Sequence, residues 1–182
     1  MSKIKHKPVP DFAVPVFRQA GIRFKKYTST ASYERDIKKF IKRNQVLHLC
    51  TCKQSRPRAT PLGYNADGFT VYVLSEGGGK FDNLKKNRNV SFSIAEPYEV
   101  KKDFFGDKGL QAWGKAKVYS IRKDPDQFSQ ALKRMNIKRG TRKLEPGDLP
   151  QAFHYRIIEI IPDRIRYRNA REGIFNVTWE RT

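Results

Sequence analysis

The sequence predicts a mainly β domain, a small closed or half-open antiparallel barrel with helices at its periphery. Two observations predict it. Between residues 45 and 168, six or so segments rich in β-branched and aromatic residues follow one another, with turn residues between them. Only short stretches show the period of helices, so a doubly wound sheet is not favoured. With 182 residues, the chain suffices for one such domain and is too short for two large ones.

The first 30 residues are predicted to form a basic arm, and residues 31–182 the barrel domain. The arm mixes prolines, basic residues and isolated aromatic residues without a clean period, so we expect an extended segment that packs on a neighbour. From Ser32 to about Arg43, apolar residues recur at helical spacing and predict a short amphipathic helix with a basic outer face.

Three strands are expected next, at residues 45–53, 57–64 and 69–75, and we interpret them as an antiparallel meander. A two-turn helix is predicted at residues 80–87, because two apolar residues there oppose a basic face. A fourth strand is predicted at residues 89–95, where apolar side chains alternate with polar ones. A helix is therefore inserted between two strands of a β domain.

A long strand is expected at residues 110–121, with Gly114 in its interior marking a bulge or a close approach of another backbone. Asp124 as N-cap and Pro125 at the first helical position then open a helix that reaches residue 135. The remaining expected elements are a loop at 140–150 and a hairpin of strands 153–161 and 164–168 that turns at Pro162-Asp163.

The charge balance is strongly basic, because 38 Lys and Arg residues face 18 Asp and Glu residues, a net charge of +20. Such a charge favours phosphates, nucleic acid or acidic lipid headgroups as partners. Only two cysteines occur, and no stretch resembles a secretory signal or a membrane span. We therefore expect a soluble, cytoplasmic protein with reduced thiols and no membrane partner.

Three consecutive glycines, residues 77–79, stand directly before Lys80 and indicate an anion site. They do not form a P-loop, because that motif needs Ser or Thr after the Lys and Phe81 stands there. Glycines still let backbone N–H groups approach a phosphate, Lys80 adds a positive charge, and Ser75 supplies a hydroxyl. The alternative is a loose turn with a solvated Lys80.

Arg58 is the residue expected to complete this site. Arg58 and Thr60 lie two residues apart on a predicted strand, so they share one face. If this strand pairs with the next one through the turn at residues 65–68, Arg58 approaches Ser75 and Lys80. The neighbours of the glycine run therefore favour a phosphate site over a loose turn.

The order of several segments matches a known pattern: the strand PRATPLGY, a turn with Asp-Gly, the strand VYVLS, a loop ending in Lys, a helix with Asn-Leu and the strand NVSFSI. This order resembles the FMN-binding split-barrel family related to pyridoxamine 5′-phosphate oxidase. The resemblance runs from about Ser32 to Arg168 and rests on order and spacing. It implies a six- to seven-stranded antiparallel split barrel that binds FMN, and a flavin-dependent oxidoreductase.

The resemblance also implies which residues hold the cofactor. In the family, the FMN phosphate is bound by a strand Arg, a Ser or Thr that ends the next strand, and the Lys of the following loop; these correspond to Arg58, Ser75 and Lys80. The flavin ring lies along the Arg-bearing strand and at the end of the next strand. The further positions implied to contact FMN are Ala59, Thr60, Pro61, Leu62, Val73, Leu74, Gly79, Gln111 and Trp113.

Partners follow from the same resemblance. Family members are usually homodimers with cofactor sites at the subunit interface, which implies that Gln111, Trp113 and the C-terminal Trp179 come from the second subunit. The other implied partner is a small-molecule electron donor or acceptor. No side chain emerges as a general acid or base, which suits a reductase whose substrate stacks on the flavin.

The chain departs from the family in two places. Many relatives carry Arg before the loop Lys, where this chain has Gly79. The Lys, Tyr, Arg and Ser set with which the true oxidase binds pyridoxal phosphate, and its closing Arg-Leu-His segment, are absent. We therefore do not expect oxidation of pyridoxamine 5′-phosphate itself.

A metal or redox site is an alternative for His48, Cys50 and Cys52, which alternate on one face of a strand. Positions two apart lie ~6.6 Å from each other along a strand, a spacing that strains both a disulfide and a tetrahedral metal site. We expect no metal and instead place the cysteines as small residues packed inside the barrel. His154 is expected to be an ordinary strand residue.

Nucleic-acid binding is the main rival function. The basic arm and the aromatic residues Phe69, Tyr72, Phe92 and Trp113 would suit a stacking surface on a small barrel. These aromatic residues alternate as core residues do, and no RNP or KH motif occurs. A third reading keeps the barrel but replaces FMN by a deazaflavin or haem.

Overall fold

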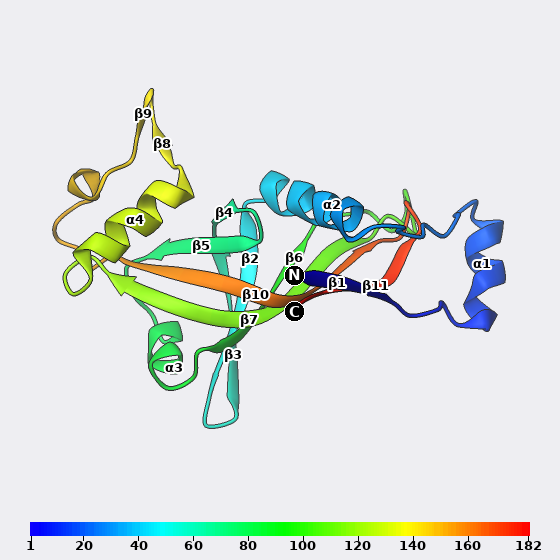
Figure 1. The fold of residues 1–182 in the computed structure, drawn as a ribbon, viewed down its shortest axis with the longest axis horizontal. Coiled ribbons are helices and arrows are strands. Elements are labelled where there is room, and N and C mark those ends of the chain that lie inside the picture. Colours follow the sequence, from blue (N-terminus) through cyan, green and yellow to red (C-terminus); the bar gives the residue numbers. More distant parts are fainter.

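A nine-stranded antiparallel sheet forms the centre of the fold in the computed structural model, which describes residues 1–182 (Figure 1). Its path runs β1-β11-β10-β7-β6-β2-β3, while β5 pairs with β10 and with β4. The strands are β1 Ser2–His6, β2 Val46–Lys53, β3 Arg56–Gly63, β4 Asn65–Asp67, β5 Thr70–Ser75, β6 Asn89–Ala95, β7 Lys108–Ser120, β10 Arg156–Asn169 and β11 Ile174–Arg181. Because β3 and β5 do not pair, the sheet is not closed. The predicted mainly β, half-open barrel with peripheral helices is confirmed.

The predicted hairpin at Pro162-Asp163 is wrong, because β10 runs through it as one strand of 14 residues. The first half of β10 pairs with β5, and its second half pairs with β11 along the same edge. On its other edge β10 follows β7, with a register shift between Pro162 and Arg164. Proline lacks the N–H that a ladder needs and is tolerated at a bulge, so it bends this strand and does not end it.

The predicted three-stranded meander is also corrected. Strands β2 and β3 do form a hairpin, with Lys53 opposite Arg56 at its closed end. However, the Asn65–Asp67 segment that was expected to be a turn is itself strand β4, which folds back on β5. The chain reverses at Gly68, whose φ is +61°, a conformation that favours glycine. The reversal leads β5 away from β3 and onto β10, and the second neighbour of β2 is β6.

Four α-helices lie around the sheet: α1 Val14–Gln19, α2 Thr30–Arg43, α3 Lys80–Lys86 and α4 Pro125–Met135. The three predicted from the sequence are present within two residues of their expected ends. Helix α2 is capped by the Ser29 hydroxyl, which accepts from the Ser32 N–H. Its apolar stripe, Tyr33, Ile37, Phe40 and Ile41, is buried against the sheet.

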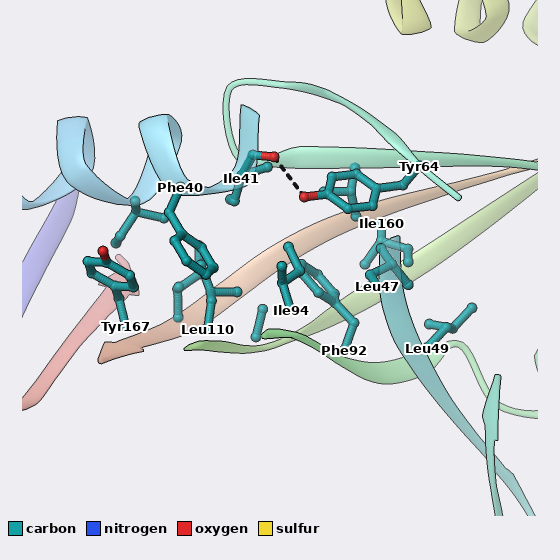
Figure 2. Close-up of a cluster of buried hydrophobic side chains, with 14 of the residues drawn as sticks. Phe40, Ile41, Leu47, Leu49, Tyr64, Phe92, Ile94, Leu110, Ile160 and Tyr167 are labelled. Carbon is teal, nitrogen blue, oxygen red and sulfur yellow. Dashed lines mark hydrogen bonds between the residues drawn. The ribbon is translucent and has the colours of Figure 1, made fainter. Parts of the chain in front are cut away.

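Three hydrogen bonds of two tyrosine hydroxyls hold α2 and its neighbours on the main core. The Tyr64 hydroxyl donates to the Ile41 carbonyl at 2.7 Å (Figure 2). The Tyr33 hydroxyl donates to the Val177 carbonyl at 2.7 Å and accepts from the Tyr167 N–H. Buried backbone groups are thereby satisfied where the helix meets β10 and β11. In the same view, Phe40 reaches down from α2 toward Tyr167.

A smaller second core lies under α4. Phe128, Leu132 and Met135 on this helix pack with Tyr72, Tyr155 and other residues of the sheet. The region predicted as a loop at 140–150 contains one strand of a two-residue-per-strand hairpin, β8 Lys138–Arg139 with β9 Arg142–Lys143. This hairpin projects beyond α4, away from the sheet (Figure 1).

Both chain ends have regular structure that the sequence did not predict. Within the expected arm, Ser2–His6 pairs with β11 as strand β1, and α1 stands away from the sheet (Figure 1). Strand β11 lies beyond the last predicted element. No helix has the length and apolar character needed to cross a membrane.

Candidate functional site

The three glycines connect the end of β5 to the start of α3, as predicted. Ser75 is the last residue of β5 and Lys80 the first residue of α3. Both are buried, with 7% and 5% of their surface exposed. The Ser75 hydroxyl donates to the Gly77 carbonyl at 3.4 Å, a long contact that a better acceptor would replace. The loop and its two flanking polar residues therefore form one compact unit.

The Lys80 ammonium folds under this loop. It donates to the Gly77 carbonyl and lies 4.9 Å from the centre of the Phe81 ring. No carboxylate forms an ion pair with Lys80 in the chain. Burial lowers its pKa, and the positive charge of Arg58 lowers it further. An anion bound here would offset both the burial of the ammonium charge and its repulsion by Arg58.

Arg58 reaches the loop from β3, as predicted, although by a different route. Its strand does not pair with β5, yet its guanidinium lies against Gly79. A Cβ atom placed on Gly79 would lie 3.2 Å from Arg58 Nη1 and 3.4 Å from Cζ, tighter than an ordinary contact. Gly79 thus leaves the space that the Arg58 side chain fills.

Arg156 is a fourth polar residue of the site that sequence reasoning missed. It begins β10 and lies opposite Ser75 in the β5–β10 ladder. Its guanidinium stacks on Phe81, 4.5 Å from the ring centre, and its charge also lowers the Lys80 pKa. No local motif marks Arg156. Only the pairing of β10 with β5 could have revealed it, and the predicted hairpin obscured that pairing.

We call Arg58, Ser75, Lys80, Arg156 and the backbone of residues 77–79 the phosphate cradle. Among the charged groups that influence Lys80, Glu76 is the one anion, and it makes no ion pair. Charge-assisted bonds from guanidinium and ammonium groups are the strong contacts that phosphate oxygens accept. The donor set and the space left by Gly79 therefore fit a phosphate monoester.

Strand β3 beside the cradle presents an unpaired edge. It ends the path of the sheet, so the backbone groups on its outer side have no strand partner. Ala59 and Pro61 are exposed, while Thr60 and Leu62 are half-buried. A planar ring with polar edges could hydrogen-bond along this free backbone.

The two predicted contacts on β5 differ from each other. Val73 is fully buried in the main core, so its side chain is not available to a ligand. Leu74 is half-buried and packs against the second core under α4. Only the backbone of these residues, or the free part of Leu74, remains for a cofactor.

Gln111 and Trp113 do not lie on the elements that form the phosphate cradle in the same chain. They sit on β7, opposite Ser93 and Ser91 of β6 and opposite Arg166 and Arg164 of β10. Gln111 is exposed and Trp113 half-buried, and they alternate with buried residues, so both belong to the sheet face that looks away from the core. The Arg164 guanidinium lies 4.1 Å from the Trp113 ring centre. We call the residues of this face, His48, Cys50, Ser91, Ser93, Gln111, Trp113, Arg164 and Arg166, the outer face.

Trp179 is not free to reach a second subunit. It is 3% exposed, packs on Phe69, and donates from its ring N–H to Glu34 at 2.7 Å. The expectation that it extends to a partner's cofactor is therefore corrected. Its hydrogen bond to α2 makes it part of its own chain's core.

The cysteines also differ from prediction. Leu47, Leu49 and Thr51 of β2 are buried, whereas Cys50 and Cys52 alternate with them and are half-buried beside the exposed His48. They lie on the outer side of the strand and do not pack inside the barrel. No cluster of three His, Cys, Asp or Glu side chains suited to a metal ion occurs in the chain.

His154 is not a strand residue, because it lies in the connection before β10. Its Nε2 is 2.7 Å from the Ser120 hydroxyl at the end of β7. Of the aromatic residues considered for base stacking, Tyr72 and Phe92 are buried. Phe69 packs against the core, so these residues do not make a stacking surface.

Residues 33–169 match the sequence profile of the family described as pyridoxamine 5′-phosphate oxidase. This match covers most of the chain and the whole region that forms the cradle. The chain belongs to the pyridoxamine 5′-phosphate oxidase family. No curated protein sequence matches it. The cradle brings together Arg58, Ser75 and Lys80, the three residues that the family resemblance implied for the FMN phosphate.

Solved structures share the fold of this pyridoxamine 5′-phosphate oxidase family member at low sequence identity. A conserved hypothetical protein of Mycobacterium tuberculosis is 19% identical with a TM-score of 0.60, over 83% of this chain and 91% of its own. HutZ, a haem storage protein of Vibrio cholerae, is 23% identical with a TM-score of 0.57, over 76% and 97%. A candidate 5-nitroimidazole antibiotic resistance protein of Bacteroides thetaiotaomicron is 12% identical with a TM-score of 0.58, over 97% and 92%. These likenesses show the split-barrel fold.

Proposed function

We propose that the protein is a cytoplasmic flavoprotein that binds FMN and works as an oxidoreductase on a small-molecule electron donor and acceptor. The observation that carries the proposal is the cradle itself. Arg58 and Lys80 lie against the glycine loop, Arg156 stacks on Phe81 beside it, and none of them has a carboxylate partner. Unpaired cations held together in a folded chain are a cost that a bound dianion removes.

The position of the cradle supports a flavin over a free phosphate. The unpaired edge of β3 begins at Arg56 and passes Arg58, so a group attached to the phosphate would lie along residues 59–62. Thr60 supplies a hydroxyl, and Leu62 supplies apolar surface. Membership of the family, in which flavin binding is common, points to the same ligand.

The cradle residues and the β3 backbone would hold different parts of FMN. Arg58, Lys80 and Arg156 would neutralise the phosphate, and Ser75 would turn its hydroxyl from the Gly77 carbonyl to a phosphate oxygen. The β3 backbone would fix the ring orientation. FMN, when bound, supplies the hydride or electron transfer, so the chain needs no acid or base of its own.

We further propose a homodimer that pairs through the outer face. Gln111, Trp113, Arg164 and Arg166 leave a polar and aromatic surface on a sheet whose other side is covered by core residues. Aromatic and arginine side chains are enriched at protein interfaces. Such pairing would carry Gln111 and Trp113 to the cradle of the second chain.

Nucleic-acid binding is the weaker candidate. The net charge of +20 supports electrostatic attraction to nucleic acid. Tyr72 and Phe92, however, are buried. Sequence-selective binding that survives moderate salt would be needed to favour it, because a steep salt dependence reports only the charge.

An absorption spectrum of the purified protein, before and after addition of FMN, tests the proposal. We expect flavin bands that stay with the protein through gel filtration. A Soret band would indicate that the protein binds haem and not FMN, and absorbance only near the ultraviolet edge would indicate a deazaflavin. Colourless protein that does not take up FMN would contradict the proposed function.

A further inference from the structure

A second basic pocket lies beside α3, and Lys80 does not line it. It is bounded by α3 and the residues after it, by the end of β7 with the turn that follows, and by the start of β10. Its volume is about 320 Å³, at the small end of the range for ligand sites. Phe81, Leu84 and Val118 form its apolar floor.

Helix α3 separates this pocket from the glycine loop. At about 100° per residue, Leu84, Phe81 and Lys85 share one side of the helix. The Asn83 amide points to the other side, where it donates to Thr51 on β2 at 3.0 Å. Lys80 does not line the pocket, because its ammonium turns back under the glycine loop to the Gly77 carbonyl. The second pocket is thus a separate site, although the aromatic ring of Phe81 lies between the two.

The pocket carries a strong excess of positive charge. Lys85, Arg88, Lys123 and Arg156 line it, against the single carboxylate of Asp124. Only Lys85 has an ion-pair partner, and that contact, at 3.4 Å to an exposed carboxylate, is solvated. The other three cations make no ion pair in the chain.

The one carboxylate of the pocket is already engaged. The Asp124 Oδ2 atom accepts from the Ser120 N–H at 3.0 Å, where it closes the turn between β7 and α4. It makes no ion pair with Lys123 or Arg156. The excess charge of the pocket is therefore not cancelled from within.

A hydrogen-bond relay places a neutral donor at the same wall. The Ser120 Oγ atom accepts from the N–H groups of Arg122 and Lys123 at 3.3 and 3.2 Å, so its own hydrogen points to His154 Nε2 at 2.7 Å. This network assigns the ring proton to Nδ1 when His154 is neutral. Burial lowers the His154 pKa, and Arg156 lowers it further, so the neutral ring prevails near pH 7.

We propose that this pocket binds a small phosphate monoester, with its phosphate on Arg156, Arg88 and Lys123 and its apolar part on Phe81 and Val118. Three unpaired cations match a dianion better than a single carboxylate. An apolar floor with a few charged groups at its rim is typical of a small-molecule site. The proposal can be tested without FMN, because Arg88, Lys123 and Val118 line this pocket and are not part of the cradle, which shares only Arg156 with it.

Titration calorimetry of the full chain with phenyl phosphate tests the proposal. Arg88→Ala and Lys123→Ala should each weaken binding about tenfold, the loss of one charge-assisted contact. Val118→Phe, which fills the floor without changing any charge, should abolish the binding that Arg88→Ala and Lys123→Ala weaken, and should leave any binding in the cradle, which responds to Arg58→Ala. The control Lys86→Ala removes a charge from the same helix outside the pocket and should change the affinity less than about twofold. Circular dichroism confirms that each variant is folded.

His154 gives a readout that is independent of the affinities. Phenyl phosphate should raise the pKa of the ring, measured by NMR, because the bound dianion offsets the charges of Arg156 and Lys123. The ring pKa should not change when the ligand is added to the Val118→Phe variant.

Four results would overturn the proposal. The first is that phenyl phosphate does not bind to the wild-type chain, and the second is that Lys86→Ala loses as much affinity as the pocket variants, which would indicate bulk charge only. The third is that only Arg58→Ala loses affinity, which would place the ligand in the cradle. The fourth is that a phosphodiester dinucleotide binds more tightly than phenyl phosphate, which would indicate a nucleic-acid backbone.

Discussion

At the scale of single residues, Lys80 is the clearest sign that the chain is built for a ligand. Its ammonium is buried beside Arg58, without a carboxylate partner. Since its pKa is lowered on folding, the unfolded chain binds more protons than the folded chain between the two pKa values. Stability contributed by this group therefore rises with pH through that window and is lowest below it.

Lys80→Met is expected to separate stability from binding. Removing a disfavoured buried charge should leave the unfolding midpoint of the FMN-free protein unchanged or raise it, while FMN binds at least about tenfold more weakly. Thermal melts and flavin fluorescence titrations measure the two effects. Lys86→Met, on the exposed end of the same helix, should alter neither. A lower midpoint with unchanged FMN affinity would assign Lys80 a structural role.

The same residue predicts a pH dependence. FMN affinity of the wild-type chain should fall as pH rises through the lowered pKa of Lys80, because the deprotonated amine no longer attracts the phosphate. The fall should be absent in Lys80→Met. Fluorescence titrations at a series of alkaline pH values, with circular dichroism to confirm folding, measure it; identical profiles for both proteins would contradict the assignment.

Gly79 and Gly77 form a matched pair. A Cβ on Gly79 meets Arg58 at 3.2 Å, whereas a Cβ on Gly77 meets nothing within 4 Å. Gly79→Ala should therefore displace the guanidinium and weaken FMN several-fold, and Gly77→Ala should not. Calorimetry with FMN decides between them; an equal effect of both substitutions would show that loop flexibility, and not space for Arg58, is what matters.

Sequence reasoning found Ser75 and Lys80 because they flank one glycine loop, and it found Arg58 from an expected pairing of its strand with the next one and from the family resemblance; that pairing does not form, although Arg58 still reaches the loop. It missed Arg156, which reaches the site only through a long-range strand pairing. It placed Cys50 and Cys52 on the wrong side of β2, because alternation shows that two faces exist and does not show which one is buried.

At the scale of elements, β7 and β10 show how the sheet bends. Gly114 lies opposite Pro162, where the register of the two strands shifts. A Cβ on Gly114 would lie 2.2 Å from the Ile161 carbonyl oxygen and 2.7 Å from Pro162 Cα. The close backbone approach predicted at this glycine is confirmed.

Gly114→Ala should therefore destabilise the fold by about 3 kcal/mol, the cost of overpacking a site that cannot relax. Gly109→Ala on the same strand, where a Cβ would meet the Ile94 carbonyl at 3.4 Å, should cost much less. Urea unfolding followed by circular dichroism compares the two. Similar losses would contradict the close approach.

Helices were easier to predict than strand pairing. The apolar stripes of α2 and α4, the Ser29 cap of α2 and Pro125 at the first position of α4 are local signals. Asp124 stands at the N-cap position as expected, but its side chain accepts from the Ser120 N–H and does not cap the helix. Which strands pair is a long-range property. The Pro162-Asp163 turn signal was overridden because β10 is held along both edges by β5, β7 and β11.

At the scale of the whole molecule, the open sheet leaves the outer face and the β3 edge uncovered in a single chain. Mainly β architecture and one domain core follow from composition and periodicity. How the chains assemble does not follow from composition and periodicity, because an interface between copies has no local signature in one sequence. The outer face, with Trp113 under Arg164, is where we propose that two chains meet.

Trp113→Arg should convert the proposed dimer to monomers and weaken FMN binding with it, because a further positive charge beside Arg164 and Arg166 would be buried without a partner at the interface. Sedimentation velocity measures the oligomeric state. Lys133→Glu, on the exposed side of α4, is the control. A wild-type chain that sediments as a monomer and still binds FMN tightly would contradict the proposed interface at the outer face.

The cradle is proposed to bind the phosphate of a flavin, and comparison of FMN with riboflavin tests this binding most directly. Each charge-assisted contact is worth about 1.5 to 3 kcal/mol, so wild-type protein should prefer FMN by about a hundredfold or more. In the Arg58→Ala, Lys80→Ala double variant that preference should largely vanish. Equal wild-type affinity for FMN and riboflavin, or a preference that survives both substitutions, would contradict the claim.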